Sequence, residues 1–222
     1  MILIENVEVS GIEPAIRGMR NPLNSWSKSD SKTVYSGIDE QQHFEVGKAD
    51  RSLMLSLTRS GTDHSKFLRM ITVHADITAP FYWWKEFDTY RFGVEKNSCS
   101  TMHRIHKQDL SIEDFSTDGM TDFAKAELES VIRTLNGLRQ SFMESESKEH
   151  WRSMIQLLPS CYNQRRTVMC SYQALRNMYH ARKHHKLIEW RQLCGWIETL
   201  PLHDLFTFDF ESEGAYAYEN DL

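Results

Sequence analysis

KFLRMITVHADITAPFYWWKEF, residues 66–87, is the stretch that decides the fold class of this chain. Residues 66–80 are rich in β-branched side chains and stop at a proline, so they predict a strand. Four consecutive aromatic residues follow at 81–84. Trp83 and Trp84 could wall a flat heterocycle, because aromatic rings stack on planar ligands, or they could be core or subunit-interface residues. The residues alone leave both interpretations open.

The rest of the front half predicts one further strand and one helix. MILIENVEVS, residues 1–10, alternates apolar and polar side chains, as a half-buried strand does. Residues 18–47 are polar and serine-rich, which predicts irregular chain. Residues 48–61 predict a helix with Asp50 as its N-cap and Gly61 just past its end.

After about residue 110 the apolar side chains recur at helical spacing. Residues 122–143 predict one helix and residues 148–159 a second. The segment from 171 to about 200 suits two more helices, which Pro201 ends. The acidic tail over about 208–222 is expected to be loose. No long linker is visible, so the sequence predicts one α+β domain over residues 1–222 with long C-terminal helices and a core over about 50–198.

Composition narrows the function classes. The chain has 222 residues, 40% hydrophobic and 26% charged, with a formal net charge of −5, which gives no reason to expect nucleic-acid binding. No apolar run approaches the roughly 20 residues that span a bilayer. The first residues do not read as a signal peptide. Four cysteines without C-x-x-C spacing suit a reducing cytoplasm and give no zinc or redox motif.

Two polar segments are candidates for binding an anion. Asn97, Ser98 and Ser100 offer donors and acceptors over one short turn, which suits a phosphate or a base edge, although a serine-rich turn also satisfies its own backbone. Arg165 and Arg166 lie in YNQRRTV, residues 162–168, and could grip a phosphate or be solvated surface arginines. For residues 97–100, composition alone favours a turn whose side chains bond its own backbone.

RNMYHARKHHK, residues 176–186, is the strongest basic cluster in this acidic chain. His180 and His184 have the i, i+4 spacing of helical metal ligands, but no glutamate lies between them and no carboxylate completes a set. We therefore expect no metal site and favour a patch that attracts phosphate. Neither G-x-G-x-x-G, G-x-x-x-x-G-K-[ST] nor G-x-S-x-G occurs, so a dinucleotide would not bind on a Rossmann turn.

The order and spacing of several motifs resemble those of the flavin-dependent thymidylate synthases. ITAPFYWW, residues 77–84, resembles the strand end, Ala-Pro and aromatic-rich helix that precede the family's R-H-R-x-x-S-x-N-E-x-S-x-R signature, whose N-x-x-S core is matched by Asn97 and Ser100. SYQALRNMYHAR, residues 171–182, resembles N-x-R-S-L-x-N-F-x-x-x-R, with Asn177 and Arg182 on the family's asparagine and arginine. It follows Leu158-Pro159 after a spacer of similar length to the family's, so the match needs no gap. SGTDHSKF, residues 60–67, resembles S-G-H-E-x-x-F.

The resemblance implies a mixed or antiparallel sheet, a cytoplasmic homotetramer with shared active sites, and methylation of dUMP with FAD, NADPH and methylenetetrahydrofolate. It implies a catalytic role for Arg182, whose guanidinium would lie beside the pyrimidine and stabilise the negative charge that develops there. The nucleotide-binding residues that it implies are Glu86, Ser98, Ser100 and Arg182. The flavin-binding residues that it implies are His64, Arg91, Asn97, Ser171, Gln173, Asn177 and His185.

The sequence also departs from the family pattern. Tyr90, Arg91 and Phe92 stand where the family has R-H-R, and the family's glutamate and last arginine are replaced by Ser98 and Met102. These changes keep two alternatives open beside dUMP methylation. One is a variant reaction of the same class, such as hydroxymethylation or the use of dCMP. The other is a non-catalytic protein that binds a nucleotide or a protein partner.

Overall fold

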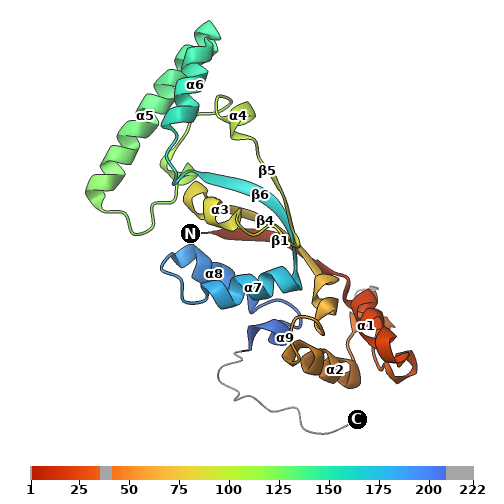
Figure 1. Cartoon of the computed structure of the whole chain (residues 1–222). Helices are drawn as coiled ribbons and strands as arrows, with labels where there is room; N and C mark the ends of the chain where they lie inside the picture. Colours follow the sequence, from red (N-terminus) through yellow and green to blue (C-terminus); the bar gives the residue numbers. More distant parts are fainter. Residues whose placement is uncertain (1, 36–41, 209–222) are drawn as a thin grey trace. The chain divides into compact units, whose positions relative to one another are not determined.

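The chain of the computed structural model, described over residues 2–35 and 42–208, divides into two units that alternate along the sequence (Figure 1). The first unit comprises Met1–Val7, His74–Met169 and His185–Leu193. The second comprises Glu8–Val73, Cys170–His184 and Cys194–Leu222, of which the tail over 209–222 lies outside the described residues. The single domain expected from the sequence therefore stays a prediction.

A sheet in the strand order β1-β4-β6-β5 runs through the first unit. Its strands are β1 (Leu3–Ser10), β4 (Thr72–Pro80), β6 (Asn163–Ser171) and β5 (Val94–Ser98). β1 and β4 confirm the predicted strands, except that Lys66–Arg69 forms the 3-10 helix η3 instead of extending β4. The prediction missed β6, because the charged Arg166 lies on the same inward face as Gln164, Val168 and Cys170 and so hides the alternation.

The helices that begin in the first unit are α3 (Phe81–Phe87), α4 (Thr101–Arg104), the 3-10 helix η4 (Ile112–Asp114), α5 (Asp122–Ser145), α6 (Lys148–Leu157) and α8 (Ile188–Ile197). α5 and α6 confirm two predicted helices and lie against each other (Figure 1). Leu128, Ile132 and Leu135 bury the predicted stripe of α5, whereas Phe123 in its first turn is exposed. Among the described helices, none is long and apolar enough to cross a bilayer.

The aromatic residues of α3 form the core of the first unit. Trp83 and Trp84 are 0% and 1% exposed, and their ring centroids lie 4.8 Å apart. Trp190 of α8 packs on Trp83 with a centroid separation of 5.0 Å. Aromatic pairs at this separation stabilise a core beyond the area that they bury. The core interpretation of the two tryptophans is confirmed, and neither ring is open to a stacked ligand.

Helices make up most of the second unit. They are α1 (Ile12–Arg20), the 3-10 helices η1 (Asn21–Leu23) and η2 (Trp26–Lys28), α2 (Lys48–Arg59), η3, α7 (Tyr172–Arg182) and α9 (Asp204–Thr207). β2 (Lys32–Tyr35) and β3 (Gln42–Glu45) pair antiparallel. The prediction of irregular chain over 18–47 is therefore wrong for these elements, whereas α2 and α7 confirm predicted helices.

A buried ion pair joins α1 to α2. Asp50 is 0% exposed, and one carboxylate oxygen accepts a hydrogen bond from Nε of Arg20 at 2.6 Å. The other oxygen accepts from the hydroxyls of Ser29 and Ser31, each at 2.6 Å. Burial works against the charge, but the hydrogen bonds outweigh it and hold the pKa of Asp50 below its ordinary value. Asp50 therefore links two helices and a loop, and its prediction as the N-cap is wrong.

Asp30 performs the capping role that the sequence assigns to Asp50. Gly47 is the N-cap residue of α2, and the Asp30 carboxylate accepts from the backbone N–H groups of Ala49 at 2.9 Å and Asp50 at 3.0 Å. A Cβ atom at Gly47 would lie 2.2 Å from the Asp30 carboxylate and 2.6 Å from its backbone carbon. Only glycine lets the loop before β2 approach the start of α2 this closely.

Replacing Asp50 with asparagine should lower the free energy of unfolding at pH 7 by about 3–5 kcal/mol, because it leaves a buried arginine without its counter-charge. The folded-state pKa of Asp50 is lowered, so its stabilisation is complete above about pH 4 and is lost as the pH falls further. Urea unfolding of wild type and Asp50→Asn should therefore differ most at neutral pH and converge in acid.

Asp109→Asn is the matched control, because the Asp109 side chain is 75% exposed and pairs with Arg139 at 2.7 Å. Exposed pairs contribute about 0–1 kcal/mol, so this variant should unfold almost as wild type does. Equal losses of unfolding free energy in the two variants would show that the buried pair contributes no more than the exposed one.

Candidate functional site

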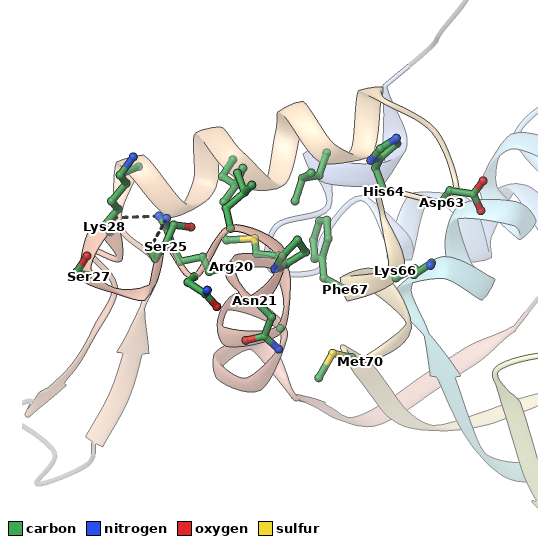
Figure 2. A pocket seen from close by; sticks show the side chains of 18 residues that line it. Arg20, Asn21, Ser25, Ser27, Lys28, Asp63, His64, Lys66, Phe67 and Met70 are labelled. Carbon is green, nitrogen blue, oxygen red and sulfur yellow. Dashed lines mark hydrogen bonds between the residues drawn. The ribbon is translucent and has the colours of Figure 1, made fainter. Parts of the chain in front are cut away.

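The main candidate site is a cavity of about 990 Å³ in the second unit (Figure 2). It lies among α1, η1, η2, α2 and the segment that ends in η3. The residues that line it are Gly18, Met19, Arg20, Asn21, Pro22, Leu23, Asn24, Ser25, Ser27, Lys28, Ala49, Leu53, Leu57, Asp63, His64, Lys66, Phe67 and Met70. Its size is at the upper end of the range that small-molecule and cofactor sites span.

The cavity has apolar walls and polar ends. Leu53, Leu57 and Phe67 belong to the apolar lining. In Figure 2, Ser27 and Lys28 lie on one side of the view and His64, Asp63 and Lys66 on the other. Apolar walls with a few polar groups are typical of sites for organic ligands, because burial supplies affinity and the polar groups fix orientation.

Arg20 shapes the wall between η1 and η2. Its two terminal nitrogens donate to the carbonyl oxygens of Ser25 at 3.2 Å and Lys28 at 3.1 Å, drawn as dashed lines in Figure 2. The same guanidinium is anchored to Asp50, so the fold of residues 21–28 depends on the buried ion pair. This is the segment that the sequence leaves as irregular chain.

His64, predicted to contact flavin, lies in this cavity. Gly61 follows α2 with a φ of +101°, and its carbonyl accepts from the backbone N–H of His64 at 3.3 Å. The exposed turn that results carries His64 and Lys66 into the lining. The placement agrees with a ligand-binding role, and the role itself stays a prediction.

α7 carries four further predicted residues of the second unit. Ser171 is buried and caps the helix, accepting from the backbone N–H of Ala174 at 3.2 Å. Gln173 donates to Oδ1 of Asn177 at 3.2 Å. Arg182 is half-buried at the end of the helix. None of these residues lines the large cavity, although α7 contacts η3, which does.

The first unit brings Glu86 and His185 together. A Glu86 carboxylate oxygen accepts from the indole N–H of Trp190 at 2.9 Å and lies 3.6 Å from Nε2 of His185. Nδ1 of His185 accepts from the backbone N–H of Leu187 at 3.2 Å. The imidazole proton therefore belongs on Nε2, which faces the carboxylate. The two side chains lie side by side, and their role in substrate or cofactor binding stays a prediction.

The remaining predicted residues also lie in the first unit. Arg91 is exposed before β5, and Asn97 and Ser98 are exposed on that strand, so the expected single turn over 97–100 is wrong. Ser100 caps α4 and lines a second cavity of about 190 Å³. Ser98 and Ser100 thus belong to one unit and Arg182 to the other, and their predicted convergence on one pyrimidine stays a prediction.

Side chains in both basic segments that the sequence singles out make structural contacts. Arg165 and Arg166 lie on β6 and pair with Asp76 at 2.8 Å and Asp88 at 2.9 Å, so both charges are already balanced. His180 donates its Nε2 proton to the carbonyl of Phe206 at 2.9 Å, which fixes α7 to α9. Within residues 2–35 and 42–208, no cluster of three or more potential ligands suits a metal ion.

Several residues with functional potential escaped the sequence analysis. Lys28 and Lys66 line the large cavity, and Arg104 and Gln164 line the small one. Arg104 carried a usable signal, because it lies two residues after Met102, where the resemblance expects an arginine. Gln164 carried none, because its importance depends on partners distant in sequence.

Comparison with known proteins identifies the fold. No family model and no curated protein matches the sequence. The solved structure of thymidylate synthase X (ThyX) from Helicobacter pylori with FAD and dUMP superposes with a TM-score of 0.69 at 16% identity, covering 94% of this chain and 98% of that one. The UMP/dUMP methylase PolB from Streptomyces cacaoi, bound with 5-Br dUMP, gives 0.58 at 16% identity over 93% and 95%. The chain therefore has the α+β fold of the flavin-dependent thymidylate synthases, as the motif spacing predicts.

The four cysteines should differ sharply toward a thiol reagent. Cys99 is exposed, whereas burial raises the pKa of Cys161 and raises that of Cys194 to about 11. In native protein at pH 8, iodoacetamide should modify Cys99 first, and the other three should react only after unfolding. Peptide mass spectrometry reads out the sites, and labelling of Cys194 as fast as Cys99 would contradict the buried environment.

Proposed function

We propose that this protein is a flavin-dependent enzyme that transfers a one-carbon unit from methylenetetrahydrofolate to C5 of dUMP, with NADPH as reductant. The observation that supports the proposal most is the fold, shared over 94% of the chain with a ThyX structure that holds FAD and dUMP. PolB, described as a UMP/dUMP methylase, has been solved with both 5-Br dUMP and 5-Br UMP. A uracil nucleotide is therefore the substrate class that we propose.

The large cavity fits part of an FAD molecule. Its apolar walls suit a planar ring, and Lys28 and Lys66 supply positive charge for a diphosphate. Neither lysine forms an ion pair within the described part of the chain. His64 offers an imidazole on the side of the cavity where Lys66 lies. These residues would hold the cofactor, and bound flavin would supply the hydride that converts the transferred methylene group into methyl.

The polar edge of α7 suits an imide group. Among the described residues, the buried Oε1 of Gln173 has no hydrogen-bond partner, which is unusual because buried polar atoms are nearly always satisfied. Its Nε2 donates to Oδ1 of Asn177, which leaves the exposed Asn177 amide nitrogen as a donor. An acceptor beside a donor matches the N–H and C=O of an imide, which both flavin and uracil carry. We propose that Gln173 and Asn177 bind such an edge.

Arg182 is the residue that we propose to act on the pyrimidine. Its guanidinium would donate to a uracil carbonyl oxygen and stabilise the negative charge that develops as C5 becomes nucleophilic. We further propose that the protein assembles as a homotetramer in which neighbouring subunits complete each site. In this arrangement Ser98 and Ser100 of one subunit serve the nucleotide beside Arg182 of another.

The proposal predicts a yellow protein that makes a methylated nucleotide. Protein reconstituted with FAD should show the visible flavin absorbance band, which should shift when dUMP is added. With methylenetetrahydrofolate and NADPH, mass spectrometry should find dTMP. Protein that stays colourless after reconstitution would refute the proposal. His64→Ala should lower flavin content, whereas His74→Ala, at an exposed histidine of β4, should not.

Arg182→Ala should lower kcat with dUMP by about 10²–10³-fold while flavin content stays unchanged, because the developing charge loses a hydrogen-bond donor. Arg182→Lys should recover part of the rate, since it keeps the positive charge but not the planar fork. Arg152→Ala, at an exposed arginine of α6, is the control and should match wild type. Equal rates in Arg182→Ala and Arg152→Ala would remove Arg182 from the mechanism.

Product mass also separates the two alternatives. Detection of a hydroxymethylated nucleotide would identify the protein as the variant of the same reaction class. Tight dUMP binding without turnover would assign a non-catalytic nucleotide-binding protein, as the substitutions at Tyr90, Phe92 and Ser98 allow.

A further inference from the structure

The loop that carries Ser100 is fastened to β6 by a buried glutamine. Gln164 is 9% exposed, and its Nε2 donates to the carbonyl of Cys99 at 2.7 Å and to Oγ1 of Thr101 at 3.3 Å. The backbone N–H of Cys99 donates to the carbonyl of Arg165 at 2.9 Å. The residues on both sides of Ser100 are therefore fixed to one strand.

The orientation of the Gln164 amide is itself imposed. Its Oε1 accepts from Nε of Arg166 at 2.9 Å, so its NH₂ group must face the loop. Arg166 is held by Asp88 at 2.9 Å and lies over the Trp84 ring, with its Cζ 4.2 Å from the centroid. The indole N–H of Trp84 donates to the backbone carbonyl of Gln164 at 2.9 Å. The aromatic core thus fixes the orientation of the Gln164 amide, and the amide fixes the position of the 99–101 loop.

The loop borders the small cavity, which holds two arginines. Arg165 is already neutralised by Asp76 at 2.8 Å and Glu5 at 3.5 Å. Arg104 forms no ion pair within residues 2–35 and 42–208, so its charge is available to a ligand. Ser100 accepts from the N–H of His103 at 3.3 Å, which leaves its hydroxyl proton free to donate.

The size of the cavity limits what it can hold. Its volume of about 190 Å³ is below the roughly 300–1,000 Å³ that sites for whole drug-sized ligands span. The cavity therefore suits one group of a ligand, such as a phosphate. The available guanidinium and hydroxyl match the oxygens of a phosphate monoester.

We propose that Gln164 is a positioning residue, which holds the 99–101 loop so that Ser100 and Arg104 together bind the phosphate monoester of the nucleotide. The identity of the nucleotide rests on the proposed function. Gln164 lines the cavity, but its amide is already bonded to the loop and to Arg166, so it acts on the ligand through the loop. Its two hydrogen bonds to the loop fix the residues on both sides of Ser100, where α4 begins and leads to Arg104.

Isothermal titration with dUMP and with deoxyuridine, which lacks the phosphate, tests this proposal. Arg104→Ala should raise Kd for dUMP by about tenfold to a hundredfold, as expected for loss of a charge-assisted hydrogen bond. Gln164→Met, which keeps the shape and removes the amide, should raise it by about tenfold. Kd for deoxyuridine should stay unchanged in both variants. Gln140→Met, at an exposed glutamine of α5 that donates to Glu144, is the matched control.

The double variant Arg104→Ala, Gln164→Met should bind dUMP little worse than Arg104→Ala alone, because the positioning residue acts through the loop. Additive losses, or equal weakening of dUMP and deoxyuridine in Gln164→Met, would overturn the positioning role. If Gln164→Met fails to fold, Thr101→Val removes one of the two loop bonds and should weaken dUMP binding severalfold in the same phosphate-dependent way.

Labelling of Cys99, which lines the same cavity, tests the phosphate site independently of the proposed function. Inorganic phosphate should protect Cys99 from iodoacetamide in wild type and not in Arg104→Ala. Such protection in a protein that binds no flavin would keep the phosphate site and refute the proposed function. Turnover of dUMP with wild-type affinity in Arg104→Ala and Gln164→Met would refute the phosphate site alone.

Discussion

The second unit depends on a positive charge that is buried with its counter-charge. Arg20 and Asp50 meet at 2.6 Å with almost no exposure, so each would be costly to bury alone. Replacing such a pair with apolar residues is often neutral for stability, which means that its value here is geometric. The same guanidinium holds the carbonyls of Ser25 and Lys28, so one arginine connects two helices and sets the wall of the large cavity.

In the first unit a buried neutral side chain, Gln164, likewise fixes a segment next to a cavity. Gln164 is satisfied at both ends of its amide, by Arg166 on one side and the 99–101 loop on the other. A buried polar network rigidifies its surroundings only when every member has a partner. Both cavities therefore border segments that a buried polar side chain fixes. The lining residues on these segments are held in place as a result.

Long periodic patterns made much of the fold predictable. β1, β4, α2, α5, α6 and α7 follow from alternation or helical spacing, and motif order was enough to anticipate the shared fold at 16% identity. The misses share one physical cause. The partners of Asp50 are 19 to 30 residues away, and those of Gln164 up to 80, so neither role shows in local sequence. His64 could be placed from its motif, whereas Lys28 and Lys66 needed the folded cavity.

The contact between Asp30 and the start of α2 has a further consequence for the β2–β3 hairpin. Ser31 accepts from the backbone N–H of Gly47 at 2.9 Å, directly beside the Asp30 cap, so the residues before β2 and after β3 are tied to each other. Because the entropy of closing a loop grows only slowly with its length, a longer insertion closed at this point would cost the fold little additional free energy. Evolution and protein engineers alike have here a place to append a new recognition element without disturbing the cavity next to it.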